Sequence, residues 1–341
     1  MVLDIERGQA LRGVKLRALV DGALRKVSGA GLDSGISTEG DYLFDGVRLW
    51  TLASDVVPAA ALGSGLFRAG LHGDATPLTV CFDDAAEAAD VARRVTALEP
   101  SPEVCHIDGK SLVAVVARRA PLLSRDDYPA DFAGEFRDLC RSGGVEPVLE
   151  HGTWRGEVLG LEVVRAVAQS QIGGRPLIEV GVGRFDREAG VLMRGGSSDA
   201  EALVAAADLV RAQRHSGAGV HPLATLARER WMRWDVCACP ESLGLSDLVP
   251  IDPADERLNL RDPAPAPAIG NDPEGGRVLV VCSVGVDPRL ISATAELVLR
   301  EAPDQVVVVL PVRDVIAPVE RVVARLRIPA SVVGLCGSWD A

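Results

Sequence analysis

The C-terminal part of the chain contains uninterrupted apolar runs that can fold in few ways. Val278 to Val284 (VLVVCSV) and Val306 to Leu310 (VVVVL) are rich in β-branched residues and carry no charge. A helical pattern follows each run, and Ser331 to Leu335 predicts a third strand. Buried strands that alternate with helices are typical of a parallel sheet covered on both faces. We therefore expect a parallel βαβαβ unit over residues 277–341, which stands alone or joins the sheet of residues 42–120.

With 341 residues, the chain exceeds one ordinary core and should form two or three domains. Short strand and helix patterns alternate from Tyr42 onward, which predicts an α/β fold. A glycine- and serine-rich stretch precedes this region, and a proline-rich stretch precedes the C-terminal unit. The expected order is an N-terminal helix and linker (1–41), a small α/β domain (42–120), a central β-rich α/β domain (130–235), a proline-rich strap (236–276) and the C-terminal α/β unit (277–341).

Composition restricts the partners that we expect. The 48 acidic and 36 basic residues give a formal net charge of −12. This charge repels phosphate at long range, so extended nucleic-acid binding is disfavoured unless a local basic groove exists. A protein partner or a small molecule is favoured instead. The polar first ten residues and the lack of a long apolar run predict a cytoplasmic protein without a membrane partner.

Glutamates gather in the central stretch from Glu146 to Ala189. On the expected strand 177–182, Glu179 shares a face with two glycines, so a ligand could approach the backbone there closely. On the expected strand 157–167, Glu162 should share a face with Val164. If both glutamates lie on one side of the sheet, their carboxylates converge. A sheet with one solvated face shows the same alternation, so a purely structural role is the alternative.

A helix, then a hairpin with an acidic residue, then a strand with a second glutamate make up the region from Asp131 to Glu188. This arrangement resembles the core of the PD-(D/E)XK nucleases, which implies a restriction-endonuclease-like fold for the central domain (130–235). The resemblance implies Mg²⁺ held between Glu162 and Glu179, where it would activate water for phosphodiester hydrolysis. The family's lysine is replaced by Gly181, and Arg184 is a poor substitute because its guanidinium cannot exchange a proton. The whole chain also resembles actinobacterial proteins, which implies no particular chemistry.

The helical pattern over Leu223 to Trp234 mixes arginine with tryptophan. Arg228, Arg230 and Trp231 could contact nucleic-acid bases or phosphates. The same pattern is typical of a helix that docks two domains, with its tryptophans buried and its arginines on the rim. We prefer the docking interpretation.

A zinc site would need His215, His221, Cys237 and Cys239. The cysteines are only two positions apart and no second pair exists, so the spacing argues against zinc. The cysteines are better explained as reduced thiols.

Acidic residues also stand at the ends of two expected strands. Asp83 and Asp84 follow one strand, and Ser283 and Asp287 follow another. The carboxyl ends of strands in open α/β sheets often bind ligands. Capping of the next helix is the simpler interpretation and the one that we prefer. In the same way, Ser198 or Asp199 should cap the helix expected over Asp199 to Arg214.

Two functions therefore remain. The first is a non-catalytic binding or assembly protein built on a degenerate nuclease-like core. The second is a divalent-metal-dependent phosphodiesterase or nuclease, in which Glu162 and Glu179 are both metal ligands and catalytic groups. Mg²⁺ is the one cofactor that the sequence suggests, and whether the protein is an enzyme stays open.

Overall fold

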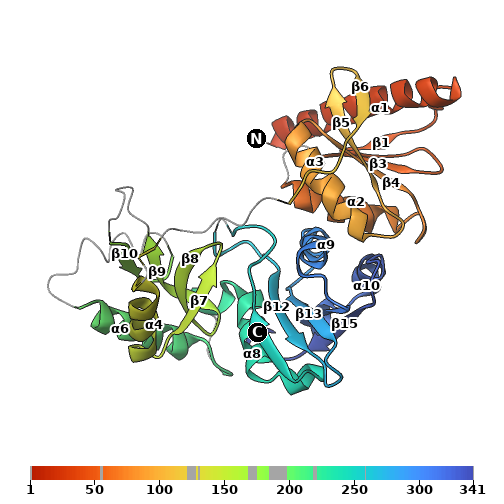
Figure 1. Ribbon diagram of the computed structural model, residues 1–341. Helices are drawn as coiled ribbons and strands as arrows, with labels where there is room; N and C mark the ends of the chain where they lie inside the picture. The colour runs from red at the N-terminus through yellow and green to blue at the C-terminus, as the bar shows by residue number, and fades with distance from the viewer. Residues whose placement is uncertain are drawn as a thin grey trace. The chain divides into compact units, whose positions relative to one another are not determined.

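The computed structural model describes residues 2–53, 57–120, 128–129, 131–167, 175–183, 198–217, 221–257 and 259–340. It has a mixed α/β fold whose described strands form a first sheet (β1 to β6), a central sheet (β10-β9-β8-β7) and a C-terminal sheet (β11 to β15) (Figure 1). The chain divides into two compact units. Unit 1 comprises Met1–Pro121, Val286–Val306 and Val315–Val332, and unit 2 comprises Leu122–Gly285, Val307–Asp314 and Val333–Ala341. Among the described helices, none has the length and apolar character needed to cross a membrane.

The first sheet belongs to unit 1. Its strands are β1 (Thr38–Glu39), β2 (Tyr42–Phe44), β3 (Leu49–Ala53), β4 (Leu78–Phe82), β5 (Glu103–Asp108) and β6 (Ser111–Ala114). β3, β4 and β5 pair in parallel, and the outer strands pair antiparallel. The parallel pairs follow from the crossover helices α2 (Pro58–Ala69) and α3 (Ala85–Arg94), which connect them. The alternating strands and helices expected from Tyr42 onward are therefore present, within a compact unit that also includes the N-terminal helix and C-terminal segments.

Helices cover both faces of the first sheet (Figure 1). The N-terminal helix α1 (Val2–Ser28) buries Leu16, Leu19 and Val20 in one core cluster with Trp50 of β3. α2 covers the opposite face of the sheet, where Gly65 lies against Thr51 of β3 and Leu78 of β4. The N-terminal helix therefore packs on the first sheet, because its apolar residues have the helical spacing that lets them face one side of the sheet.

Helices from the C-terminal part of the chain also belong to unit 1. α9 (Leu290–Glu301) contacts α2 and α3, and α10 (Ala317–Val323) contacts α2. Glu296 of α9 forms buried ion pairs with Arg93 at 2.5 Å and with Arg94 at 3.4 Å. Burial of this carboxylate is tolerated because both arginines neutralise it.

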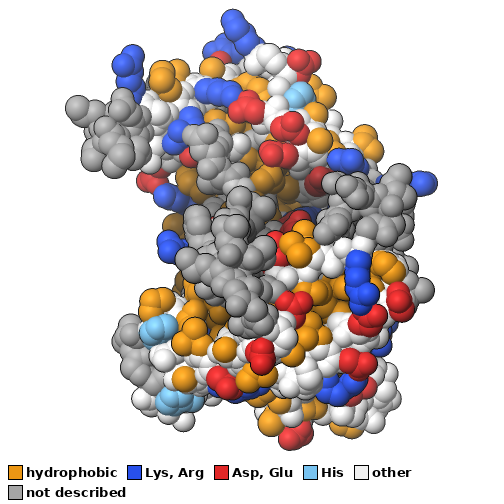
Figure 2. Space-filling model, turned by 90° about the vertical axis from the view of Figure 1, so that its left-hand side faces the viewer, with side chains coloured by type: hydrophobic (Ala, Val, Ile, Leu, Met, Phe, Trp, Pro, Cys, Tyr) orange, Lys and Arg blue, Asp and Glu red, His pale blue; other side chains and the backbone are white. Residues whose placement is uncertain are grey.

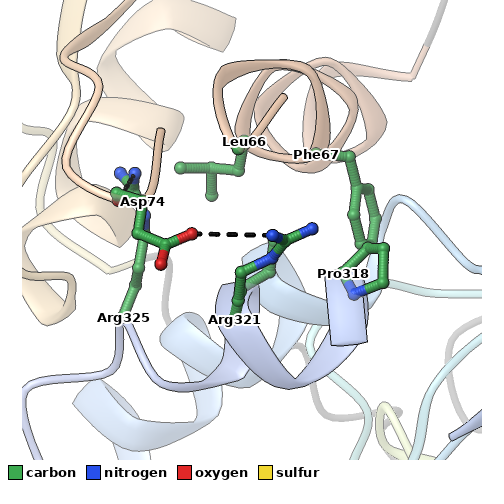
Figure 3. Close-up of a pocket in the computed structure, with 8 residues that line it drawn as sticks. Leu66, Phe67, Asp74, Pro318, Arg321 and Arg325 are labelled. Atoms are coloured by element: carbon green, nitrogen blue, oxygen red, sulfur yellow. Dashed lines mark hydrogen bonds and ion pairs between the residues drawn. The ribbon is translucent and has the colours of Figure 1, made fainter. Parts of the chain in front are cut away.

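A narrow groove separates α2 from α10 (Figure 3). Asp74 faces Arg321 across the groove at 3.7 Å, and Arg325 donates to the Asp74 carbonyl oxygen at 2.5 Å. The enclosed volume is about 10 Å³, which holds about one water molecule. The groove is therefore an ordinary helix contact rather than a ligand site.

The C-terminal sheet contains β11 (Asp247–Pro250), β12 (Ala266–Asn271), β13 (Arg277–Cys282), β14 (Gln305–Pro311) and β15 (Ala330–Leu335). Strands and helices alternate from β13 onward, as the sequence predicts. These strands form a sheet separate from the first one, so the shared sheet that the sequence left open does not form.

The expected proline-rich strap is partly a sheet. β11 pairs antiparallel with β12, and β12 with β13. Pro267 fits within β12 because its carbonyl oxygen accepts from Ile251, just beyond the end of β11. The N and C=O groups of a residue point to the same side of an antiparallel strand, so the missing N–H of Pro267 does not face β13. The strap prediction is therefore wrong for these two segments.

The central sheet belongs to unit 2 and consists of β7 (Glu146–Glu150), β8 (Thr153–Val158), β9 (Leu161–Val167) and β10 (Leu177–Val180). The helices of this unit are α4 (Phe132–Ser142), α6 (Asp199–Gln213), α7 (Pro222–Thr225) and α8 (Arg228–Ala238). Short 3₁₀ turns lie at Val95–Ala97, Pro240–Leu243, Val312–Asp314 and Ser338–Asp340. Ser198 caps α6 in a capping box with Glu201, as the sequence suggested for this helix start.

A close backbone contact in unit 1 gives a test of this packing. A Cβ atom at Gly63 of α2 would clash with the carbonyl oxygen of Pro288. We expect Gly63→Ala to lower the free energy of unfolding by about 1 to 3 kcal/mol, because a backbone atom cannot move aside cheaply. Urea unfolding followed by circular dichroism measures this change.

Gly134→Ala is the matched control, because Gly134 lies in helix α4 with open space around it. This substitution should be neutral or stabilise the protein by up to about 1 kcal/mol. Equal stability of the two variants would contradict the contact between Gly63 and Pro288.

Candidate functional site

Two tight turns set the register of the central sheet. His151 and Gly152 join β7 to β8, and Leu159 and Gly160 join β8 to β9. The φ angles are 48° and 78° in the first turn and 49° and 72° in the second, as in two-residue hairpin turns of type I′. The single strand expected over 157–167 is therefore wrong. It was missed because a leucine in a left-handed conformation gives no turn signal.

A β-bulge in β9 decides which of its residues share a face. Gly156 pairs with Val164, whereas Glu157 pairs with Glu162, so Val163 is an extra residue between the two pairs. An extra residue in one strand reverses the alternation of faces beyond it. Glu162 therefore lies on the same face as Glu157. The expectation that it shares a face with Val164 is wrong.

The central sheet has one apolar face and one charged face. The apolar face, with Val164 and Val180, packs against Phe136 of α4 and Leu203 of α6. The charged face carries Glu150, Arg155, Glu157, Glu162, Arg165 and Glu179. The strand register thus places Glu162 and Glu179 on one side of the sheet.

Helix α8 contributes two arginines to the charged face. Arg230 donates to Glu157 at 2.5 Å and also to Glu150, and Arg233 donates to Glu157 at 3.1 Å. The two arginines can reach one carboxylate because residues three apart lie on the same side of a helix. Gly160 allows this approach, since a Cβ atom there would clash with the Arg230 carbonyl group.

Two further arginines come from the sheet itself. Arg155 lies 3.1 Å from Glu162, and Arg165 lies 3.0 Å from the other oxygen of the same carboxylate. We call this set the acid–arginine network; it consists of Glu150, Glu157, Glu162, Arg155, Arg165, Arg230 and Arg233. Apart from Arg165, whose side chain is 31% exposed, these side chains are at most 4% exposed.

The arginines keep the buried Glu150 carboxylate ionised. Burial alone would raise the pKa of Glu150, but Arg230, Arg155 and Arg233 outweigh it and lower the pKa to about 2. Burial would lower the pKa of Arg230, and the neighbouring glutamates outweigh it and raise that pKa instead. These groups therefore stay charged at neutral pH and are poorly suited to exchange protons in general acid–base catalysis.

Arg165 interacts with both glutamates that the sequence proposed as metal ligands. It pairs across the strands with Glu179 and bonds directly to Glu162. Both glutamates raise its pKa against the lowering effect of burial. A divalent ion between these carboxylates would have to displace a guanidinium that already neutralises them. Among the described residues, no group of three or more His, Cys, Asp or Glu side chains could hold a metal ion.

The remaining residues of the proposed nuclease motif add no proton-exchanging group. Gly181, at the position of the family's lysine, donates its backbone N–H to the Val163 carbonyl oxygen at 2.8 Å. Arg184, considered as a substitute, lies outside the described residues.

Helix α8 has an apolar side as well as a charged one. Trp231, Met232 and Val236 are buried in a cluster with β12 and β13 of the C-terminal sheet. α8 is therefore a docking helix within unit 2, between the central and C-terminal sheets. Arg230 and Trp231 are only 4% and 3% exposed, so the prediction that the arginines lie on the rim is wrong for Arg230.

These exposures also bear on the nucleic-acid prediction. A base or phosphate cannot reach the buried Arg230 and Trp231 in this conformation. Of the three residues proposed for such a contact, Arg228 alone is partly exposed.

The residues considered for zinc have other roles. His221 accepts a hydrogen bond from the backbone N–H of Leu223 at the start of α7, and the His215 ring contacts the Ser216 carbonyl oxygen. Burial raises the pKa of the Cys237 thiol to about 11. A thiol that holds its proton so firmly is a poor metal ligand.

Of the acidic residues at strand ends, Asp84 and Asp287 accept hydrogen bonds at helix starts, and Asp83 forms an ion pair. Asp84 accepts from two backbone N–H groups at the start of α3, and Asp83 pairs with Lys15. Asp287 accepts from the backbone N–H of Arg289 just before α9. The capping interpretation accounts for these contacts without a ligand.

Sequence reasoning missed Arg155 and Arg165 as members of the site. Arginine supplies nearly all the basic residues of this chain, so no single arginine stood out. One signal was available in the sequence: an arginine followed by a glutamate (Arg155, Glu157) is succeeded by a glutamate followed by an arginine (Glu162, Arg165), as expected for facing strands of a hairpin. It becomes visible only when a turn is placed at Leu159 and Gly160.

A scan against protein-family models and searches of curated proteins and of solved structures found no match to this chain. The nuclease resemblance therefore stays a prediction.

The network makes a direct prediction about stability. Arg230→Met should lower the free energy of unfolding by about 3 to 5 kcal/mol, because it leaves Glu150 and Glu157 buried with fewer positive partners. Arg228→Met, on the same helix but partly exposed, should change it by about 0.5 kcal/mol or less. Chemical unfolding of both variants measures the difference. Equal losses would show that the buried pairs do not hold α8.

A second prediction concerns acid stability. The pKa of Glu150 is about 2 in the folded protein against an ordinary 4.5. Because the folded value is lower, Glu150 stabilises the fold above about pH 4.5, and this contribution is lost as the pH falls toward about 2. We expect Glu150→Gln to flatten the dependence of unfolding free energy on pH in this window. An unchanged slope in urea unfolding from pH 2 to 7 would contradict the assignment.

Proposed function

We propose that this chain is a non-catalytic binding or assembly protein built on a degenerate nuclease-like core. The observation that supports this best is Arg165, which bonds to Glu162 and stands directly opposite Glu179 on the neighbouring strand. A guanidinium there neutralises the carboxylates, as a metal ion would in a nuclease, but it supplies no Lewis acid and no activated water. In this proposal the residues of the former metal site now stabilise the fold through ion pairs.

The proposed nuclease-like core is supported by the order of its helix and strands and by the shared face of its two glutamates. A helix (α4) precedes a hairpin (β8 and β9) with Glu162, and the next described strand (β10) carries Glu179 on the same face. The alternative, a divalent-metal phosphodiesterase, would use the same two glutamates. It requires metal to compete with the guanidiniums of both Arg155 and Arg165 for Glu162.

The surface supports a protein or small-molecule partner over nucleic acid. Among the described side chains on the face shown in Figure 2, basic and acidic ones are interspersed, without an extended basic area. Together with the net charge of −12, this favours partners that do not depend on phosphate contacts.

A metal titration separates the two functions. We expect Mg²⁺ or Mn²⁺ to shift the melting temperature of the EDTA-treated protein by less than about 1 °C. A metal at 100 times its dissociation constant would instead add about 2.7 kcal/mol, or several degrees for a unit of this size. Differential scanning fluorimetry measures the shift.

The variants make the result specific. Glu179→Ala should leave the metal response unchanged, and Glu135→Ala, an exposed glutamate on α4, is the matched control. A saturable stabilisation by metal that is abolished in Glu179→Ala and kept in Glu135→Ala would overturn the proposal in favour of the phosphodiesterase.

A further inference from the structure

Unit 1 contains a cavity at one edge of the first sheet, far along the chain from the acid–arginine network. Its volume is about 220 Å³. Its walls come from the segment before β1, from strands β1 to β3 and from the last turn of α2 and the residues beyond it. The lining residues are Ile36, Ser37, Glu39, Tyr42, Leu43, Phe44, Leu49, Arg68 and His72. We call this cavity the aromatic pocket.

Strand alternation explains why aromatic residues line the pocket. In β2, Leu43 packs on the side of α1 in the core cluster. Tyr42 and Phe44 therefore project from the opposite face of the sheet, where Phe44 pairs across the strands with Leu49. β2 lies next to the edge strand β1, and α2 ends at Ala69. The Tyr42 and Phe44 rings therefore lie near the end of α2, the helix that covers this face of the sheet.

The pocket contains two stacked pairs of planar side-chain groups. The Phe44 and His72 rings are stacked with centroids 3.9 Å apart and an interplanar angle of 13°. The Arg68 guanidinium lies over the Tyr42 ring, 4.6 Å from its centroid. Flat π surfaces and a stacked guanidinium bind planar aromatic rings by offset stacking.

The same arginine provides a charged contact that a ligand can take over. Arg68 forms an ion pair with Glu39, whose side chain is 73% exposed, while that of Arg68 is 41% exposed. Exposed pairs of this kind are weak. A ligand carboxylate could replace Glu39 and accept two parallel hydrogen bonds from the guanidinium, a geometry that suits carboxylates.

We propose that the aromatic pocket binds a small planar aromatic carboxylate. The ring stacks beside Phe44 and His72, and the carboxylate binds Arg68 in place of Glu39. A volume of about 220 Å³ lies below the range of about 300 to 1,000 Å³ that is usual for drug-sized ligands. The ligand therefore has one ring or two fused rings rather than the bulk of a nucleotide.

The net charge of the protein does not prevent this binding. Salt screens the interaction of an anion with distant surface charges beyond about 8 Å at physiological ionic strength. Arg68 and Glu39 both line the pocket, and the exposed Glu39 side chain can turn toward solvent once it is displaced.

Isothermal titration calorimetry with indole-3-carboxylate tests the proposal. We expect saturable binding at a single site. Arg68→Gln should weaken it about 10-fold or more, because it removes a hydrogen bond to a charged group. Phe44→Leu should weaken it by about 3-fold to 10-fold, because it removes the ring stack. Arg321→Gln, an arginine of the same unit outside the pocket, should bind like the wild type.

Two matched ligands separate the ring from the charge. Cyclohexanecarboxylate keeps the charge without the π face, and indole-3-carboxamide keeps the ring without the charge; both should bind more weakly than indole-3-carboxylate. Circular dichroism confirms that each variant is folded. Lack of saturable binding to the wild type, or equal affinity in Arg68→Gln and Arg321→Gln, would overturn the proposal. Either outcome leaves the function proposed for unit 2 unaffected.

Discussion

Burial of charge on one side of helix α8 is the constraint on which unit 2 depends. Removing a carboxylate and a guanidinium from water costs several kcal/mol for each ion, and only close pairing offsets this cost. Arg230 meets this requirement with Glu150 and Glu157 together. Apolar side chains in the same place would tolerate a small slide of the helix, whereas these ion pairs would not. We infer that the network fixes the position of α8 more than it adds to the overall stability.

The other contacts of α8 agree with this role. Gly160 leaves room for the helix backbone, and Trp231 fills the space toward the C-terminal sheet. Arg214 lies over the Trp231 ring, 5.1 Å from its centroid, and donates to the carbonyl oxygens of Leu159 and Leu223. Burial lowers the pKa of Arg214 to about 9. The buried Arg214 thus donates hydrogen bonds to backbone carbonyl groups in a tight turn and in the single-turn helix α7, where the carbonyl groups have no partner within a helix or sheet.

The sequence predicted those features whose signals are local. The caps at Asp84 and Ser198 follow from one residue and its next turn, and the facing of β10 follows from uninterrupted alternation. The turn at Leu159 and the bulge at Val163 have no such local signature, because only pairing with a neighbouring strand reveals them. The strands within the proline-rich segment were missed for a similar reason. Whether a proline fits a strand depends on which side its nitrogen faces.

The bulge also explains why the metal hypothesis could be right about geometry and still be unfavourable chemically. Without the extra residue, strand alternation would turn Glu162 toward the apolar face, away from Glu179. With it, Glu162 and Arg165 both face the side of Glu179, since Arg165 is paired directly with Glu179. The same register that puts the two carboxylates on one face therefore also puts a guanidinium on that face. Any metal-binding relative of this sheet would need a different residue at position 165, because a permanent positive charge there opposes a divalent cation.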